Sequence, residues 1–182
     1  MNKHFLAAWS ATGRAEGGYV DHPADKGGPT NHGITEQVAR AHGYVGHMRD
    51  LPKEVATRIA YEQYWQIIRL DDVAQISLAI ALEMFDSAFL CGQATVVTWL
   101  QRCLNVANRQ ARDYPDIRVD GLMGPITIAS LRAFISKRGM NGETAMLNAL
   151  NGLQSAHFTT IAERREANEE FWFGWQLNRV RL

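Results

Sequence analysis

The segment VAQISLAIALEMFDSAFLC, residues 73–91, constrains the fold more than any other part of the chain. Its apolar residues occupy most sides of a helix rather than alternating along a strand, which predicts a helix that is buried on nearly all sides. Such a helix needs other elements packed around it. Apolar residues also recur at helical spacing elsewhere, and they predict helices over residues 3–15, 35–42, 50–66, 93–106, 125–137 and 142–167. Because period-two alternation is almost absent, we expect a mainly α-helical fold.

The composition narrows the class of protein. The chain has 182 residues, which suits one domain, and its 19 Lys and Arg balance its 19 Asp and Glu. A net charge of zero gives no indication of a nucleic-acid partner. No run approaches the roughly 20 apolar residues of a membrane span, and the apolar start at residues 5–9 is too short for a secretion signal. We therefore expect a soluble protein that is made in the cytoplasm and does not insert into membranes.

Neither the cysteines nor the histidines predict a metal site. Cys91 and Cys103 form no C-x-x-C motif and are too few for a disulfide framework, so we interpret them as reduced core residues. A zinc site would draw on the loop histidines, which are His22, His32, His42 and His47. They form no H-E-x-x-H motif, and no cysteine is near them in the sequence. We expect neither a metal nor another cofactor.

Residues 15–35, AEGGYVDHPADKGGPTNHGIT, hold the densest group of unusual side chains. Glu16 ends the first predicted helix, where the helix dipole and partial enclosure raise the pKa of a carboxyl group. Asp25 lies in a glycine-rich loop, where water and backbone N–H groups keep it ionised. Cleavage of a glycosidic bond requires one protonated and one charged carboxyl group, and the Thr30 hydroxyl adds a group that can hold a water. The alternative is an ordinary helix end followed by an ordinary turn.

The same segment resembles the signature of a known enzyme family. Glu-Gly-Gly-Tyr at 16–19, a spacer, and Asp-x-Gly-Gly-x-Thr-x-x-Gly-Ile-Thr at 25–35 match glycoside hydrolase family 108 at every specified position. These enzymes are N-acetylmuramidases and are often phage endolysins. The downstream segments GHMRDLPKEVATRIAYEQYW, WLQRCLNV and VDGLMGPITIASL are similar to the rest of the family pattern. Two departures are Leu90, where the family has asparagine, and a longer insertion at 108–118.

The resemblance implies a lysozyme-like helical fold in which a small loop or hairpin carries the active site. Residues 1–90 would form the catalytic part of one domain, and residues 91–182 a peptidoglycan-binding-like part packed against it. Glu16 would be the general acid that cleaves the β-1,4 bond between N-acetylmuramic acid and N-acetylglucosamine. Asp25 would be a base, an electrostatic stabiliser or a loop anchor. The threonine of the related phage lysozyme pattern follows its aspartate at a different spacing, so Thr30 need not have the same position.

The resemblance also implies a biological setting. A phage endolysin is made in the host cytoplasm, is released by a holin, acts on peptidoglycan glycan strands and needs no oligomer. Two other functions stay open. A lytic transglycosylase also needs an acidic glutamate but closes the muramic ring instead of adding water. A non-catalytic peptidoglycan-binding or secretion-associated protein could keep the fold, although it has no need of Glu16.

Several other side chains have both a functional and a structural interpretation. Tyr19 and His32 lie in the site segment, and we expect both to contact substrate. Tyr61 and Tyr64 are candidates for stacking on sugar rings, although aromatic residues at helical spacing are more often core residues. Asp86 lies in an apolar helix and is interpreted as a structural anchor, because a buried carboxylate needs a partner.

The C-terminal segment FWFGWQLNRVRL mixes aromatic residues with arginines. Such a segment can touch a membrane surface. The interpretation that we favour is that its rings cover the core while its arginines are solvated.

Overall fold

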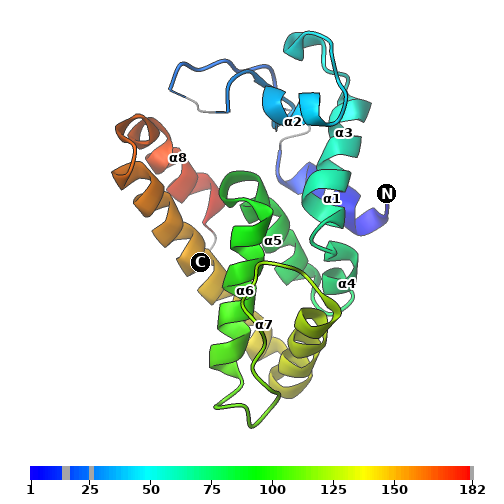
Figure 1. Cartoon of the computed structure of the whole chain (residues 1–182), viewed down its shortest axis with the longest axis vertical. Coiled ribbons are helices and arrows are strands. Elements are labelled where there is room, and N and C mark those ends of the chain that lie inside the picture. The colour runs from blue at the N-terminus through cyan, green and yellow to red at the C-terminus, as the bar shows by residue number, and fades with distance from the viewer. Residues whose placement is uncertain (14–16, 25–26, 181–182) are drawn as a thin grey trace.

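The computed structural model describes residues 1–13, 17–24 and 27–180, and it is mainly helical as expected (Figure 1). Helix α1 spans Lys3–Ala11, and the Asn2 side chain caps it by accepting from the Phe5 N–H. Gly13 follows with φ of +66°. The helix predicted for residues 3–15 is therefore too long. Because α1 ends at Ala11, it does not provide the helix end on which the pKa expectation for Glu16 depends, and Glu16 itself lies outside the described residues.

The hairpin expected near the site is present. Strands β1 (Thr30–Asn31) and β2 (Ile34–Thr35) pair antiparallel through a turn in which His32 and Gly33 both have positive φ, +49° and +73°. Thr35 then caps α2 (Glu36–Ala41) by accepting from the Val38 N–H, as predicted.

The hairpin is fixed to the next element by a buried side chain. The Asn31 amide donates to the carbonyls of Met48 and Arg49 at 2.8 and 3.1 Å. These carbonyls belong to the short 3-10 helix η2 (Met48–Asp50). Asn31 is 4% exposed, so its amide needs these two partners.

A helical segment links the hairpin to the core. Helix α3 (Lys53–Ala60) begins after Pro52 and passes into a π-helical turn, η3 (Tyr61–Gln66). Helix α4 (Leu70–Ala74) follows. Its Asp71 accepts hydrogen bonds from the side chains of Asn2 and Trp65, and these bonds join the start of α1 to η3 and α4.

The central helix is α5, which spans Leu78–Cys91. The predicted helix at 73–91 is real but broken, because Ser77 caps a new helix by accepting from the Ile80 N–H. The rings of Phe5 and Trp65 meet Phe85 of α5 edge to face, with centroids 5.7 and 5.4 Å apart. Burial of this helix and of these rings accounts for much of the apolar core.

The remaining helices pack around α5. Helix α6 spans Gln93–Ala107, and α7 spans Pro125–Glu163 with a kink at Gly139 (φ 57°, ψ −146°), so the two helices predicted there are both present. A 3-10 turn, η4 (Glu166–Asn168), leads into α8 (Glu169–Arg179). The aromatic C-terminal segment is therefore a helix, which its pattern did not predict.

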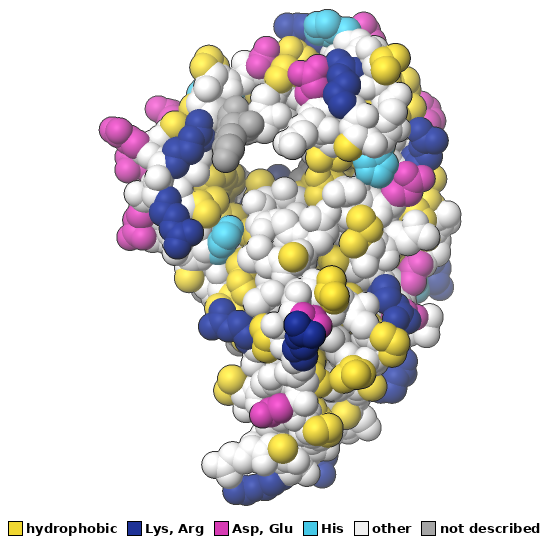
Figure 2. Space-filling view, viewed as in Figure 1, with side chains coloured by type: hydrophobic (Ala, Val, Ile, Leu, Met, Phe, Trp, Pro, Cys, Tyr) yellow, Lys and Arg dark blue, Asp and Glu magenta, His cyan; other side chains and the backbone are white. Residues whose placement is uncertain are grey.

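The elements form two lobes on either side of a hollow (Figures 1 and 2). The hairpin lobe contains the segment 17–24, the hairpin, α2 and α3, and the helical lobe contains α5 to α8. One cluster of buried apolar residues continues from α1 and α3 through α5 into α6 and α7. Cys91 is buried in it, Cys103 lies at its edge, and both are free thiols. No helix in the described part of the chain is long and apolar enough to cross a membrane.

Candidate active site

The two predicted acids lie outside the described residues, and the residues next to them in the sequence show where the candidate site lies. Glu16 and Asp25 are both outside the described ranges. Gly17, the next residue after Glu16, accepts a hydrogen bond from the His32 N–H at 3.2 Å. Val20 and Thr30 exchange two backbone hydrogen bonds of 2.8 Å each. The chain that follows Glu16 therefore runs along the hairpin as an additional extended segment.

Thr30 has a local structural role in this arrangement. Its hydroxyl donates to the Gly28 carbonyl at 3.0 Å, and Gly28 has φ of +67°. The Glu36 N–H donates to the Pro29 carbonyl at 2.8 Å. These bonds fix the end of the glycine-rich loop. The Thr30 oxygen keeps acceptor capacity, so a contact with water or substrate stays a prediction.

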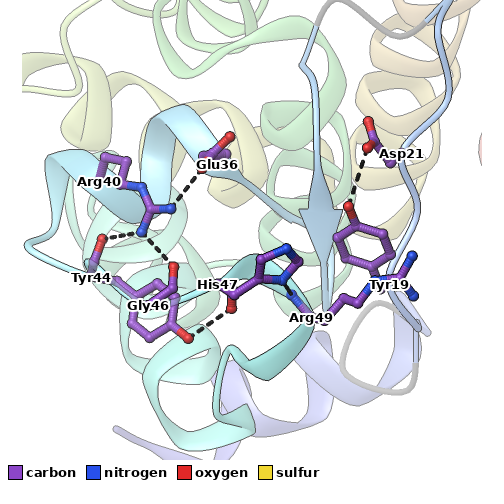
Figure 3. Close-up of polar contacts among 8 residues, drawn as sticks. All are labelled: Tyr19, Asp21, Glu36, Arg40, Tyr44, Gly46, His47 and Arg49. Atoms are coloured by element: carbon purple, nitrogen blue, oxygen red, sulfur yellow. Dashed lines mark hydrogen bonds and ion pairs between the residues drawn. The ribbon is translucent and has the colours of Figure 1, made fainter.

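Tyr19 is the best-defined aromatic side chain of the site segment (Figure 3). Its hydroxyl donates to Asp21 at 3.2 Å, and the guanidinium carbon of Arg49 lies 4.1 Å from the centre of its ring. Partial burial and the Asp21 carboxylate raise the pKa of Tyr19, whereas Arg49 opposes the shift. The phenol therefore stays protonated at neutral pH, and it can offer a ring face and a hydroxyl to a sugar.

Sequence reasoning missed Arg49, and a small network explains how Arg49 is held (Figure 3). Arg40 donates to the carbonyls of Tyr44 and Gly46 at 2.8 and 2.7 Å. The Tyr44 hydroxyl donates to the His47 carbonyl at 3.0 Å, and the His47 ring accepts from the Arg49 N–H at 3.1 Å. The loop before η2 is thus tied to α2. No local sequence signal links Arg49 to Tyr19, because the two come together only through the hairpin.

Tyr61 and Tyr64 lie in the aromatic core, which is the alternative that their helical spacing left open. Tyr64 is 7% exposed and stacks on Phe89 with centroids 3.8 Å apart. Tyr61 meets Phe5 edge to face at 5.0 Å, and its hydroxyl donates to Asp71 at 3.5 Å. These contacts give both rings a structural role. A contact of either ring with substrate stays a prediction, as does the contact of His32.

Two acidic residues of α5 also have described partners. Asp86 accepts from Arg179 of α8 at 3.2 Å, and the same guanidinium donates to the Thr12 carbonyl at 3.3 Å. Arg179 therefore has partners, where the sequence suggested a solvated arginine. Glu83 is 9% exposed and accepts from the Ser87 hydroxyl at 2.9 Å. Asp86 joins α5 to α8, in keeping with a structural anchor.

Comparison with known proteins decides the family. Residues 9–92 match the family described as Glycosyl hydrolase 108, and residues 95–180 match the family described as Predicted Peptidoglycan domain. Residues 9–92 form a glycosyl hydrolase family 108 domain. It is a glycoside hydrolase, and the second match makes peptidoglycan its substrate class.

No curated protein matches the chain. Among the solved structures, one similar protein covers nearly its whole length. The structure titled "Structure of Brucella abortus SagA" shares 27% sequence identity with this chain. The match covers 98% of this chain and 96% of that chain, with a TM-score of 0.66. The likeness therefore includes both matched segments and not the first one alone.

The two departures from the family pattern lie at the end of α5 and after α6, outside the hairpin lobe. Leu90, where the family has asparagine, is half-buried and packs against the apolar core. The insertion at 108–118 closes on itself, because the Asn108 side chain accepts from the Ala111 N–H and the Asp113 N–H donates to the Asn108 carbonyl. Neither change adds a charged group to the hairpin lobe.

In the described residues, neither a group of metal ligands nor the cavity between α6 and α7 marks the site. Within residues 1–13, 17–24 and 27–180, no group of three or more His, Cys, Asp or Glu side chains is placed to hold a metal ion. A cavity of about 830 Å³ lies between α6 and α7, with Phe134 and Met146 among its lining residues. It lies beside the kink of α7 and includes no residue of the hairpin lobe. The motif and its contacts with the hairpin therefore locate the candidate site.

Proposed function

We propose that this family 108 enzyme is an N-acetylmuramidase that hydrolyses the β-1,4 bond between N-acetylmuramic acid and N-acetylglucosamine. The motif residues from Glu16 to Thr35 and the family match support this reaction. The observation that carries the proposal is the backbone bond between Gly17 and His32, because it holds the chain next to Glu16 against the hairpin. A general acid needs such a fixed backbone to meet the leaving oxygen.

In this mechanism, Glu16 protonates the oxygen of the leaving sugar. Asp25, assisted by Thr30, stabilises the positive charge that develops on the other sugar or positions the attacking water. Two carboxyl groups about 5–5.5 Å apart would give retention of configuration, and a separation of about 6.5–9.5 Å would give inversion. Tyr19 offers a ring face and a hydroxyl to the substrate, and its protonated phenol adds no negative charge.

The rival reaction is that of a lytic transglycosylase, which would use the same acid. The two reactions leave different muramic ends, so mass spectrometry of digested peptidoglycan distinguishes them. Hydrolysis adds one water for each bond that is broken and leaves reducing ends. Products that carry only anhydro-muramic ends would contradict hydrolysis and establish the transglycosylase.

The direct test of the proposed function is Glu16→Gln. Loss of a general acid should lower the rate of wall clearance by about 10²–10⁴-fold. Glu163→Gln, at the exposed end of α7, is the matched control and should keep the wild-type rate. Both variants should melt like the wild-type protein. If Glu16→Gln cleared permeabilised cells as fast as wild type, Glu16 would not be the general acid and the proposed mechanism would be wrong.

We further propose a phage endolysin setting, in which a monomer reaches the wall through a holin pore. The family resemblance supports this setting. Expression in a bacterial host, with and without a co-expressed holin, tests it. Lysis should follow only when the holin is present. Lysis at the same rate without a holin would show that the chain reaches the wall by another route.

A further inference from the structure

The C-terminal helix contacts the site segment across the hollow between the lobes. Arg165, just before η4, donates from its Nη1 to the Ala24 carbonyl at 2.8 Å, although the two residues are 141 positions apart. The ring of His22 meets the ring of Phe171 edge to face, with centroids 5.4 Å apart. Residues 21–24, called the strap below, therefore rest on the start of α8.

The helical side of this contact is firmly held. The Arg165 Nη1 also donates to the Asn168 side chain at 2.8 Å, and the Asn168 amide donates to the Ile161 carbonyl at 2.9 Å. Phe171 stacks on Trp175, which in turn lies against the fully buried Phe158. The guanidinium and the Phe171 ring are thus oriented by contacts within the helical lobe as well as by the strap.

The strap itself is held much less. Residues 21–23 are exposed, and Ala24 is half-buried. Within the segment, the Ala24 N–H donates to the His22 ring at 3.2 Å, and Asp21 accepts from Tyr19. In residues 21–24, the described contacts with the helical lobe are one hydrogen bond to a carbonyl and one ring contact at the surface, which are weak enough to break and form again.

The same helix closes the hollow at its other end. Arg179, in the last turn of α8, donates to the Thr12 carbonyl and to Asp86. Helix α8 therefore runs from the strap to the end of α1, and with the strap it bridges the two lobes along one side of the hollow (Figures 1 and 2). The lobes and this bridge form a ring.

We propose that the strap and α8 encircle the glycan strand, and that Arg165 controls whether the enzyme cuts within strands and keeps hold of them between cuts. This inference rests on the proposed function, and it adds that the strand lies in the hollow. A strand can enter a ring only by its end or when the ring opens. Peptide cross-links are too bulky to thread, so entry into intact wall requires the strap to leave α8. Closure behind the strand then retains it for successive cuts.

A covalent lock on the ring distinguishes entry of a strand by its end from entry through an opened ring. The pair His22→Cys and Phe171→Cys, in a Cys103→Ala background, can be joined by a short bis-maleimide. The joined protein should keep hydrolysing short, uncross-linked glycan oligomers within about twofold, and its rate on intact sacculi should fall at least about tenfold. The same protein capped with N-ethylmaleimide is the control and should act on both substrates.

The outcomes are distinct. If the joined protein digests sacculi as fast as the capped protein, the ring does not control entry and the inference is wrong. If the capped protein is inactive on sacculi and on oligomers while wild type is active, the strap positions the active site rather than admitting the strand, and the inference is also wrong. If wild type is inactive on both substrates, the proposed hydrolysis itself fails.

A second measurement tests whether the enzyme holds the glycan strand between successive cuts. Arg165→Gln should release the strap and give more long fragments early in a digest, because each encounter with a strand yields fewer cuts. Compared with Arg165→Gln, Arg165→Lys should give a larger share of short fragments, since an ammonium group can also donate to a carbonyl. Arg164→Gln, at the neighbouring exposed position, is the control. Identical fragment-length distributions for wild type, Arg165→Gln and Arg164→Gln would overturn the role of Arg165.

Discussion

The Gln154 amide of α7 donates to the Ser87 hydroxyl of α5 at 2.8 Å, inside the core and across the boundary between the two matched family segments. The Ser87 hydroxyl donates in turn to the Glu83 carboxylate at 2.9 Å, so a chain of three polar side chains links the segments. Gln154 and Ser87 are 0% and 1% exposed. Buried polar groups of this kind stabilise only while their partners remain.

Ser87→Ala should therefore destabilise the whole molecule. The change removes one hydrogen bond from Gln154 and one from Glu83, and we expect the free energy of unfolding to fall by about 1–3 kcal/mol. Urea denaturation followed by circular dichroism measures the effect. Ser136→Ala, an exposed serine of α7, is the control and should change little. Equal midpoints for the two variants would show that the chain of polar groups contributes nothing.

Two glycines of α7 should respond to alanine in opposite ways. A methyl group at Gly142 would overlap the Arg138 Cβ and lie 3.4 Å from the Phe134 ring, because the kink at Gly139 brings the preceding turn close. Gly142→Ala should lower the free energy of unfolding by about 1–3 kcal/mol. At Gly152 an added methyl group meets nothing within 4 Å, so Gly152→Ala should raise it by about 0.5–1 kcal/mol. The reverse order of the two denaturation midpoints would contradict the kinked packing.

Stability at alkaline pH should depend on Tyr114. Burial, and then the charge of Asp113, raises the pKa of Tyr114 from 10.0 to about 12, and the hydroxyl donates to the Leu104 carbonyl at 2.8 Å. Because the folded state holds this proton more tightly than the unfolded chain, the stabilisation is complete below pH 10 and is lost as pH rises toward about 12.

Tyr114→Phe tests this dependence. The variant should be less stable at neutral pH by about 1 kcal/mol, and it should lose less stability than wild type between about pH 9 and pH 11. Urea denaturation across this range gives both quantities. Tyr44→Phe also removes one hydroxyl bond to a carbonyl and serves as the control. If Tyr114→Phe lost as much stability as wild type at alkaline pH, the loss would come from the titration of other groups.

Asp25→Asn separates chemistry from loop anchoring. If Asp25 stabilises charge or positions water, the rate on sacculi should fall by about 10²-fold while the melting temperature stays that of wild type. Asp21→Asn, in the same loop and bonded to Tyr19, is the comparison and should cost much less in rate. A parallel loss of melting temperature and rate in Asp25→Asn would instead make Asp25 an anchor of the glycine-rich loop.

The sequence predicted the elements whose signals are local. Thr35 caps α2 as its position suggested, and the buried helix around Phe85 is present. The sequence could not predict that Ser77 restarts this helix, because the apolar pattern runs on through the break. The sequence did not predict helix α8 because its aromatic rings lie on both its buried and its exposed sides. Phe171 and Trp175 face the fold, whereas Phe173 is 70% exposed, so no single apolar face stands out in the sequence.

In the candidate site, too, the sequence predicted the features with local signals and missed the contacts between distant residues. The Glu16–Thr35 motif identified the family, and it also indicated the hairpin that holds Thr30 and His32. The partners of that segment come from distant parts of the chain. Arg49 lies on Tyr19 and Arg165 lies on Ala24 only because η2 and η4 fold back to them. Pairings of this kind depend on tertiary packing, which spacing along the sequence does not record.

The loop after α6 offers a use that is independent of catalysis. Arg109, Gln110 and Ala111 all have left-handed φ, between 57° and 62°, and Asp113 pairs with Arg109 to hold the turn together. The loop is tied at its base by Asn108, so its tip carries little of the core. An affinity tag or a cargo domain spliced in at this tip should leave the enzyme folded, which would let the protein deliver a passenger to the bacterial wall.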